Sequence, residues 1–97
     1  MDEEKILEYI RDMARRAAEL AEETKIEPEE YEKGITAGEF ARAIGQNQTH
    51  AQRKLRKLVY EGKLEVGEAL RKGITGRVYR APVYREPRGE EGGGIPG

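Results

Sequence analysis

The sequence contains no cysteine, no tryptophan and no serine, and it has a single histidine, His50. Without cysteine the chain has no disulfide, no thiolate nucleophile and no cysteine ligand for a metal. His50 stands beside Gln and Arg residues rather than carboxylates, so no nucleophilic triad can be assembled. One histidine and scattered glutamates also lack the ligand spacing of structural zinc. We therefore expect neither an enzyme nor a metal or cofactor site.

Long apolar runs are missing as well. No stretch approaches the roughly 20 consecutive apolar residues that cross a bilayer, and the acidic start, with Asp2, Glu3 and Glu4, is unlike a secretory signal. Gly73 and Gly76 belong to no phosphate-binding loop, because no GK[ST] motif follows them. We expect a cytoplasmic protein with no membrane partner and no small-molecule ligand.

Charged residues are abundant but unevenly distributed. They make up 38% of the 97 residues, against about 25% in average proteins, a bias that is typical of thermophile proteins. Residues 1–49 hold 7 Lys or Arg against 13 Asp or Glu, whereas residues 50–88 hold 11 against 4. A duplex responds to the nearest protein face, within a Debye length of about 10 Å. The basic second half is therefore compatible with nucleic acid, although the net charge is −1.

The longest periodic segment runs over about 3–24. Its apolar residues recur at helical spacing: Ile6, Ile10, Met13, Ala17 and Leu20. One helix of this length would be about 33 Å long, longer than a small domain needs for a single packing helix. We expect it to close the core and, through its excess length, to contact a second copy in a homodimer. The segment 25–33 then suits a connection with one helical turn beginning at Pro28.

A short helix is predicted over 37–44. Thr36 and Glu39 have the spacing of a capping box, in which each side chain satisfies a backbone amide of the first turn. Gly45 follows the helix and can adopt the left-handed conformation that ends helices. Residues 34–35 just before it can add a very short strand.

A second helix is predicted over 48–61, with Asn47 as its N-cap. Its apolar face consists of Ala51, Leu55, Leu58 and Val59. Its other side carries Thr49, His50, Arg53, Arg56 and Lys57. Tyr60 is expected to pack against the domain, and Gly62 ends the segment.

Residues 63–84 are predicted to form a β-hairpin. The first strand begins with alternating polar and apolar residues over 63–66, and residues 77–84 are rich in the strand-forming residues Val and Tyr. Residues 71–76 between them supply two glycines and two cations, which indicates a basic turn. Residues 89–97 are rich in glycine and have little to bury, so we expect a flexible tail.

The short capped helix, the glycine turn, the second helix with Ala and Leu inward and the hairpin together resemble winged-helix DNA-binding proteins, above all prokaryotic transcriptional regulators. The resemblance covers about residues 34–84. It implies an α+β fold, a winged helix-turn-helix with a three-helix core and a C-terminal β-hairpin wing, in one domain over 1–88. It also implies sequence-specific binding of double-stranded DNA, with the recognition helix 48–61 in the major groove and the wing on the backbone or in the minor groove.

Outward residues near the start of the recognition helix are the candidates for reading base edges: Thr49, His50, Gln52 and Arg53. Arg53 is the first choice because a guanidinium can donate two parallel hydrogen bonds to guanine, and Gln52 can favour adenine. The candidates for contact with the DNA backbone are Gln48, Arg56, Lys57, Arg71, Lys72, Thr75 and Arg77. Arg80, Arg85 and Arg88 can extend this basic path. Each side chain also has a purely structural explanation, as a solvated face, a cap, a support for the turn or ordinary surface charge.

Two other functions remain open at this point. Winged domains also serve as protein-interaction modules in transcription, replication or chromosome assemblies, and fold alone does not decide function. In that case the acidic first helix or the basic face would be the working surface. RNA or single-stranded nucleic acid is less favoured, because five Tyr and one Phe leave few aromatic rings for base stacking once the core is built.

Overall fold

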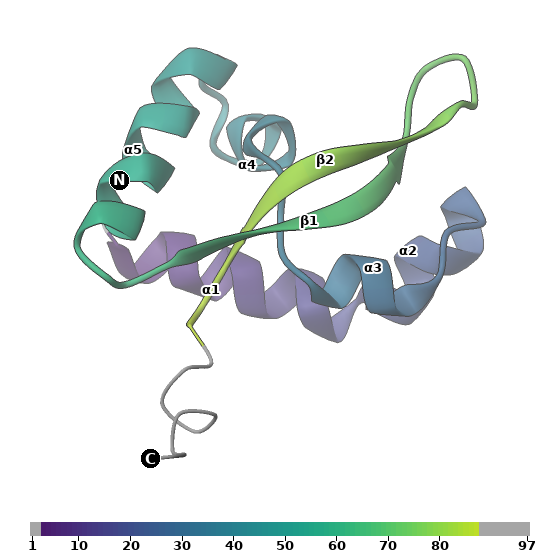
Figure 1. Ribbon diagram of the computed structural model, residues 1–97, viewed down its shortest axis with the longest axis horizontal. Coiled ribbons are helices and arrows are strands. Elements are labelled where there is room, and N and C mark those ends of the chain that lie inside the picture. Colours follow the sequence, from purple (N-terminus) through teal and green to yellow (C-terminus); the bar gives the residue numbers. More distant parts are fainter. Residues whose placement is uncertain (1–2, 88–97) are drawn as a thin grey trace.

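The computed structural model describes residues 3–87 and has an α+β architecture, as predicted. The helices of this part of the chain are α1 (Glu3–Arg15), α2 (Ala17–Thr24), α3 (Pro28–Glu32), α4 (Ala37–Ile44) and α5 (Gln48–Tyr60), and the strands are β1 (Glu65–Lys72) and β2 (Val78–Arg85). In Figure 1 the hairpin crosses above α1, with α5 at one end of the molecule and α2 and α3 at the other. Arg88 and the tail predicted over 89–97 lie outside the described residues.

The prediction of one unbroken helix over 3–24 is wrong. The chain leaves helical geometry at Arg16, where φ is −95° and ψ is 12°. Arg16 N still donates to Asp12 O at 3.1 Å, and Leu20 N donates to Arg16 O at 3.0 Å, so the break is a local bend and not a loop. Beyond the bend, α2 packs on α3 through a small apolar cluster made of Ala17, Ala21, Ile26 and Tyr31. The 33 Å rod on which the homodimer contact was based is therefore interrupted, and that contact stays a prediction.

The main core lies between α1, α4, α5 and the base of the hairpin. Its helical residues come from these three helices, among them Ile6, Ile10, Met13, Phe40, Ala41, Ala51, Leu55 and Leu58. Leu64, at the start of the hairpin, and Tyr84 of β2 complete the cluster. The predicted packing of Tyr60 is wrong, since this side chain is 96% exposed. The position falls on the outer side of α5, one residue beyond the half-buried Val59.

The ends of α4 and the start of α5 are formed by the caps that the sequence predicts. Thr36 Oγ1 accepts a hydrogen bond from Glu39 N at 3.1 Å, and Glu39 Oε1 accepts one from Thr36 N at 2.9 Å. Gly45 ends α4 with a φ of 68°. Asn47 Oδ1 accepts from His50 N at 2.8 Å and so caps α5. The helices predicted over 37–44 and 48–61 are confirmed, the second ending one residue early.

The hairpin is joined to the helices at its base. The short strand predicted before α4 is a single bridge, in which Ile35 N donates to Tyr84 O at 3.0 Å and Tyr84 N donates to Ile35 O at 2.7 Å. Gly34 has a φ of +142°, and a Cβ at this position would lie 2.5 Å from Tyr84 O. Glycine is therefore required for this close approach. The bridge fixes the hairpin against the start of α4.

Glu30 of α3 closes the exposed edge of β1. Its Oε1 accepts a hydrogen bond from Leu70 N at 2.8 Å, and both of its carboxylate oxygens accept from Lys33 Nζ, at 3.1 and 3.0 Å. The hydrogen bond from Leu70 and then that from Lys33 lower the pKa of Glu30 below its usual value. A paired carboxylate at a strand edge also keeps other strands from pairing there.

Because the folded-state pKa of Glu30 is lowered, its stabilising effect is present above the unfolded-state pKa of about 4.3 and is lost as the pH falls through the folded value. We expect Glu30→Gln to lower the free energy of unfolding at pH 7 by about 1 kcal/mol. This difference from the wild type should shrink in acid, as measured by urea denaturation across pH. Glu29→Gln, on an exposed neighbour, is the control. A difference that stays constant with pH would contradict this role.

Candidate nucleic-acid interface

About half of the Lys and Arg residues that the structure describes are paired with carboxylates, and most of those without such a partner form one group. Arg11, Arg15, Arg16, Lys33, Lys63, Arg71, Arg80 and Arg85 each lie within 4.0 Å of a carboxylate oxygen. Among the described residues, those with no such partner are Lys25, Arg42, Arg53, Lys54, Arg56, Lys57, Lys72 and Arg77. Seven of these eight belong to α4, to α5 or to the distal end of the hairpin. Positive charge that is not neutralised internally is thus concentrated in one region.

The outer face of α5 carries most of the predicted base-reading residues. Thr49, His50 and Arg53 are exposed, and Gln52 is half-buried. The backbone amide of His50 serves the N-cap, while its side chain remains on the surface. Farther along the helix Arg56 and Lys57 are exposed too. The structure therefore brings these side chains together on one accessible helix face.

The distal end of the hairpin carries the other predicted contacts, Lys72, Thr75 and Arg77, all exposed. Gly73 N donates to Arg77 O at 2.8 Å and closes the turn between the strands. Figure 1 shows this turn and the first turn of α5 rising on the same side of the molecule, away from α1. The start of α5 and the end of the hairpin that carries Lys72 and Arg77 therefore lie on one side of the molecule.

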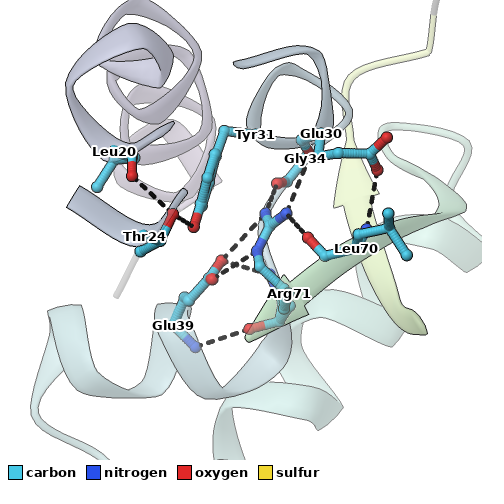
Figure 2. Close-up of polar contacts among 9 residues, drawn as sticks. Leu20, Thr24, Glu30, Tyr31, Gly34, Glu39, Leu70 and Arg71 are labelled. Carbon is cyan, nitrogen blue, oxygen red and sulfur yellow. Dashed lines mark hydrogen bonds and ion pairs between the residues drawn. The ribbon is translucent and has the colours of Figure 1, made fainter. Parts of the chain in front are cut away.

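Arg71 does not belong to this surface, which corrects its prediction as a DNA-backbone contact. Its side chain is 4% exposed, and Figure 2 shows it pointing inward between α3 and α4. Its Nε donates to Glu39 Oε2 at 2.8 Å and its Nη2 donates to Gly34 O at 2.7 Å. Strand alternation is the signal that reveals it, because Arg71 shares the inward face of β1 with the buried Ala69, whereas Lys72 faces outward. The sequence-based prediction rested on charge and not on alternation.

The two further candidates of β2 that the structure describes are engaged with carboxylates. Arg85 Nε donates to Glu65 Oε2 at 2.7 Å, across the register that places these residues opposite each other. Arg80 lies 3.9 Å from Glu68 in an exposed pair. Their charges are partly neutralised within the hairpin. The basic surface thus ends at Lys72 and Arg77, at the distal end.

A groove of about 750 Å³ opens between α5 and the hairpin. Its walls include Gln48 and Gln52 of α5, Arg42 of α4, and Lys72 and Tyr79 of the hairpin. Arg42 is exposed and was not among the residues predicted from the sequence. The groove arises only when α4, α5 and the hairpin pack together, so no local pattern reveals it. Its walls also include apolar side chains and the carboxylate of Glu39, but the cations Arg42 and Lys72 give an anionic chain two points of contact.

Within the part of the chain that the structure describes, no three His, Asp or Glu side chains are placed to hold a metal ion together. Nor does any helix within residues 3–87 combine the length and apolar character that crossing a membrane requires. Comparisons of this chain with protein-family models, with curated proteins and with solved structures give no match.

Proposed function

We propose that this protein binds double-stranded DNA in a sequence-specific manner, as a winged helix-turn-helix regulator of transcription. The observation that carries the proposal is the clustering of unpaired cations on α4, α5 and the distal end of the hairpin, in a protein that pairs most of its other cations. In the folded protein these cations have no carboxylate partners among the described residues, and the phosphates of a polyanion can neutralise them. Neutralisation of phosphates by such cations, with release of counterions, supplies much of the free energy of duplex binding.

The dimensions of α5 and of the major groove support the mode of binding. The groove, about 12 Å wide, admits one helix, and the residues near the start of that helix reach the base edges. Arg53 lies in this part of α5, where its two parallel donors fit the O6 and N7 atoms of guanine. Thr49, His50 and Gln52 adjoin it and contact the neighbouring bases.

The groove beside α5 supports a path for the sugar-phosphate backbone. One strand would run between Gln48 on the helix and the outward Lys72 on the hairpin, with Arg42 of α4 beside it. Thr75 and Arg77 would contact the phosphates beyond, at the wing. If Arg53 reads a base, the cations left for phosphate are Arg42, Lys54, Arg56, Lys57, Lys72 and Arg77.

A salt titration tests this arrangement. Six phosphate contacts should give a slope of about −5 for log affinity against log salt concentration. The measurement is fluorescence anisotropy of a labelled duplex at several salt concentrations, first with mixed sequences and then with a duplex selected from a random pool. Absence of binding at low salt contradicts the proposal and favours the alternative of a protein-interaction module. A palindromic selected site would support the homodimer.

A further inference from the structure

The turn of the hairpin holds an apolar side chain away from the rest of the protein. Ile74 is fully exposed, and Val78 and Tyr79 just beyond the turn are about half exposed. Gly73 and Gly76 flank the tip, so that only Ile74 and Thr75 place side chains there. The tip is therefore narrow, and its leading side chain is a branched aliphatic one.

The tip has a defined shape. Gly73 N donates to Arg77 O at 2.8 Å, and Gly76 N donates to Gly73 O at 3.0 Å. Gly76 has a φ of 86°, a left-handed conformation that few other residues adopt. These bonds define the backbone of the turn on which Ile74 stands. A preorganised contact loses less conformational entropy on binding than a loose loop does.

Cations stand on both sides of the apolar tip. Lys72 ends β1 and Arg77 precedes β2, both exposed and without an ion pair among the described residues. The nearest carboxylate along the hairpin, Glu68, lies farther down β1 and pairs with Arg80. An apolar point between two positive charges is complementary to the minor groove, which has a narrow floor of stacked bases and a phosphate chain along each edge.

We infer that Ile74 is a wedge that enters the minor groove beside the site contacted by α5 and bends the DNA there. Lys72 and Arg77 hold the two flanking phosphate chains while the side chain of Ile74 partly unstacks one base step. Such wedges act most easily at pyrimidine–purine steps, which unstack more readily than others. Ile74 thereby selects sequence through DNA deformability, at a position where no hydrogen bond reads a base. The inference rests on the DNA binding proposed above.

The test compares the wild type with Ile74→Ser and Ile74→Leu on one selected duplex labelled at both ends. Energy transfer between the two labels reports bending, and anisotropy reports affinity. We expect Ile74→Ser to lose most of the bend and to bind roughly tenfold more weakly, while the salt slope stays unchanged because no charge is removed. Ile74→Leu should keep both properties. Tyr60→Ser is the matched control, because it removes another exposed apolar side chain, at the last residue of α5 and away from the turn.

Results that would overturn the wedge can be distinguished from results that would overturn DNA binding. A wild type that binds without bending, or an Ile74→Ser variant that binds and bends like the wild type, overturns the wedge while DNA binding stands. A wild type that does not bind DNA at low salt overturns both proposals. If Ile74→Ser leaves DNA binding intact but abolishes cosedimentation with anionic lipid vesicles, the tip is a membrane contact and the wedge is refuted. Thermal unfolding should be equal in all variants, because Ile74 is fully exposed.

Discussion

Replacing Glu39 with leucine is expected to lower the free energy of unfolding by about 3 kcal/mol, because the buried Arg71 guanidinium then loses its carboxylate partner. Glu39 Oε2 accepts from Arg71 Nε at 2.8 Å, and the Arg71 side chain is 4% exposed against 19% for Glu39. The same carboxylate accepts from Thr36 N at 2.9 Å. The substitution therefore removes a buried ion pair and one half of the α4 capping box together.

The effect is large because Arg71 joins several segments of the fold, as Figure 2 shows. Its Nη1 donates to Glu30 O and Leu70 O, each at 3.0 Å, and its Nη2 donates to Gly34 O at 2.7 Å. The guanidinium carbon also lies 4.3 Å from the centre of the Tyr31 ring. One side chain thus fastens β1 to α3, to the segment before α4 and to α4 itself. We expect the hairpin to lose its fixed position when this centre is broken.

The Tyr31 ring is itself held in place. Thr24 Oγ1 donates its proton to Leu20 O at 2.7 Å. The Tyr31 hydroxyl lies 2.7 Å from Thr24 Oγ1 and therefore donates its own proton to that oxygen. The ring consequently presents its face to the Arg71 guanidinium. A cation over an aromatic face is worth more when it is desolvated, so α2 contributes indirectly to the position of the hairpin.

Urea denaturation followed by circular dichroism measures the change, with Glu68→Gln as control. Glu68 pairs with Arg80 at 3.9 Å, but both side chains are well exposed, at 69% and 78%, so its loss should change stability by less than about 0.5 kcal/mol. The double variant Glu39→Leu with Arg71→Met should recover much of the loss, because it leaves no unpaired buried charge. A Glu39→Leu variant as stable as Glu68→Gln would contradict the importance of this pair.

The parts of the fold that could be predicted from the sequence are those determined by neighbours in the chain. Thr36 and Glu39 cap α4 across three residues, and Asn47 caps α5 in the same way. The interruption at Arg16 has no such local signal, since neither glycine nor proline marks it. It follows from tertiary packing, because Ala17 and Ala21 must meet Ile26 and Tyr31. Such packing depends on contacts between separate segments, so the periodicity of one segment does not predict it.

The same distinction applies to the candidate site. The position of Arg53 on α5 follows from helical geometry alone, and the structure leaves it exposed and unpaired among the described residues, as that geometry predicts. Arg71 was misplaced because its prediction rested on charge and not on strand alternation, and because its ion-pair partner Glu39 is 32 positions away in the sequence. Arg42 was missed for a related reason, since it lines a groove that forms only when α4, α5 and the hairpin pack together. Charge counting identified the basic region but not which cations in it are free.

The Arg53→Ala and Arg56→Ala variants should separate base reading from phosphate contact on α5. Loss of a bidentate arginine–guanine contact removes about 1–3 kcal/mol of discrimination, so Arg53→Ala should relax the preference at one position of the selected site. Arg56→Ala should instead weaken binding to all duplexes alike and reduce the salt slope by about 1. Together the two substitutions should weaken binding to the selected site by about 100-fold or more.

A matched control makes this comparison decisive. Arg15→Ala removes the same charge from α1, where the side chain is 74% exposed and pairs only weakly with Asp12 at 3.3 Å. In Figure 1, α1 lies on the side of the molecule opposite the first turn of α5. The charge of Arg15 is screened over such a distance. We therefore expect Arg15→Ala to bind DNA with an affinity within about twofold of the wild type. Selection from random duplexes with each variant reports the preference at every position. Equal affinities and equal preferences for Arg15→Ala, Arg53→Ala and Arg56→Ala would exclude α5 as a recognition helix, because free charge on that helix would then have no more effect than charge elsewhere.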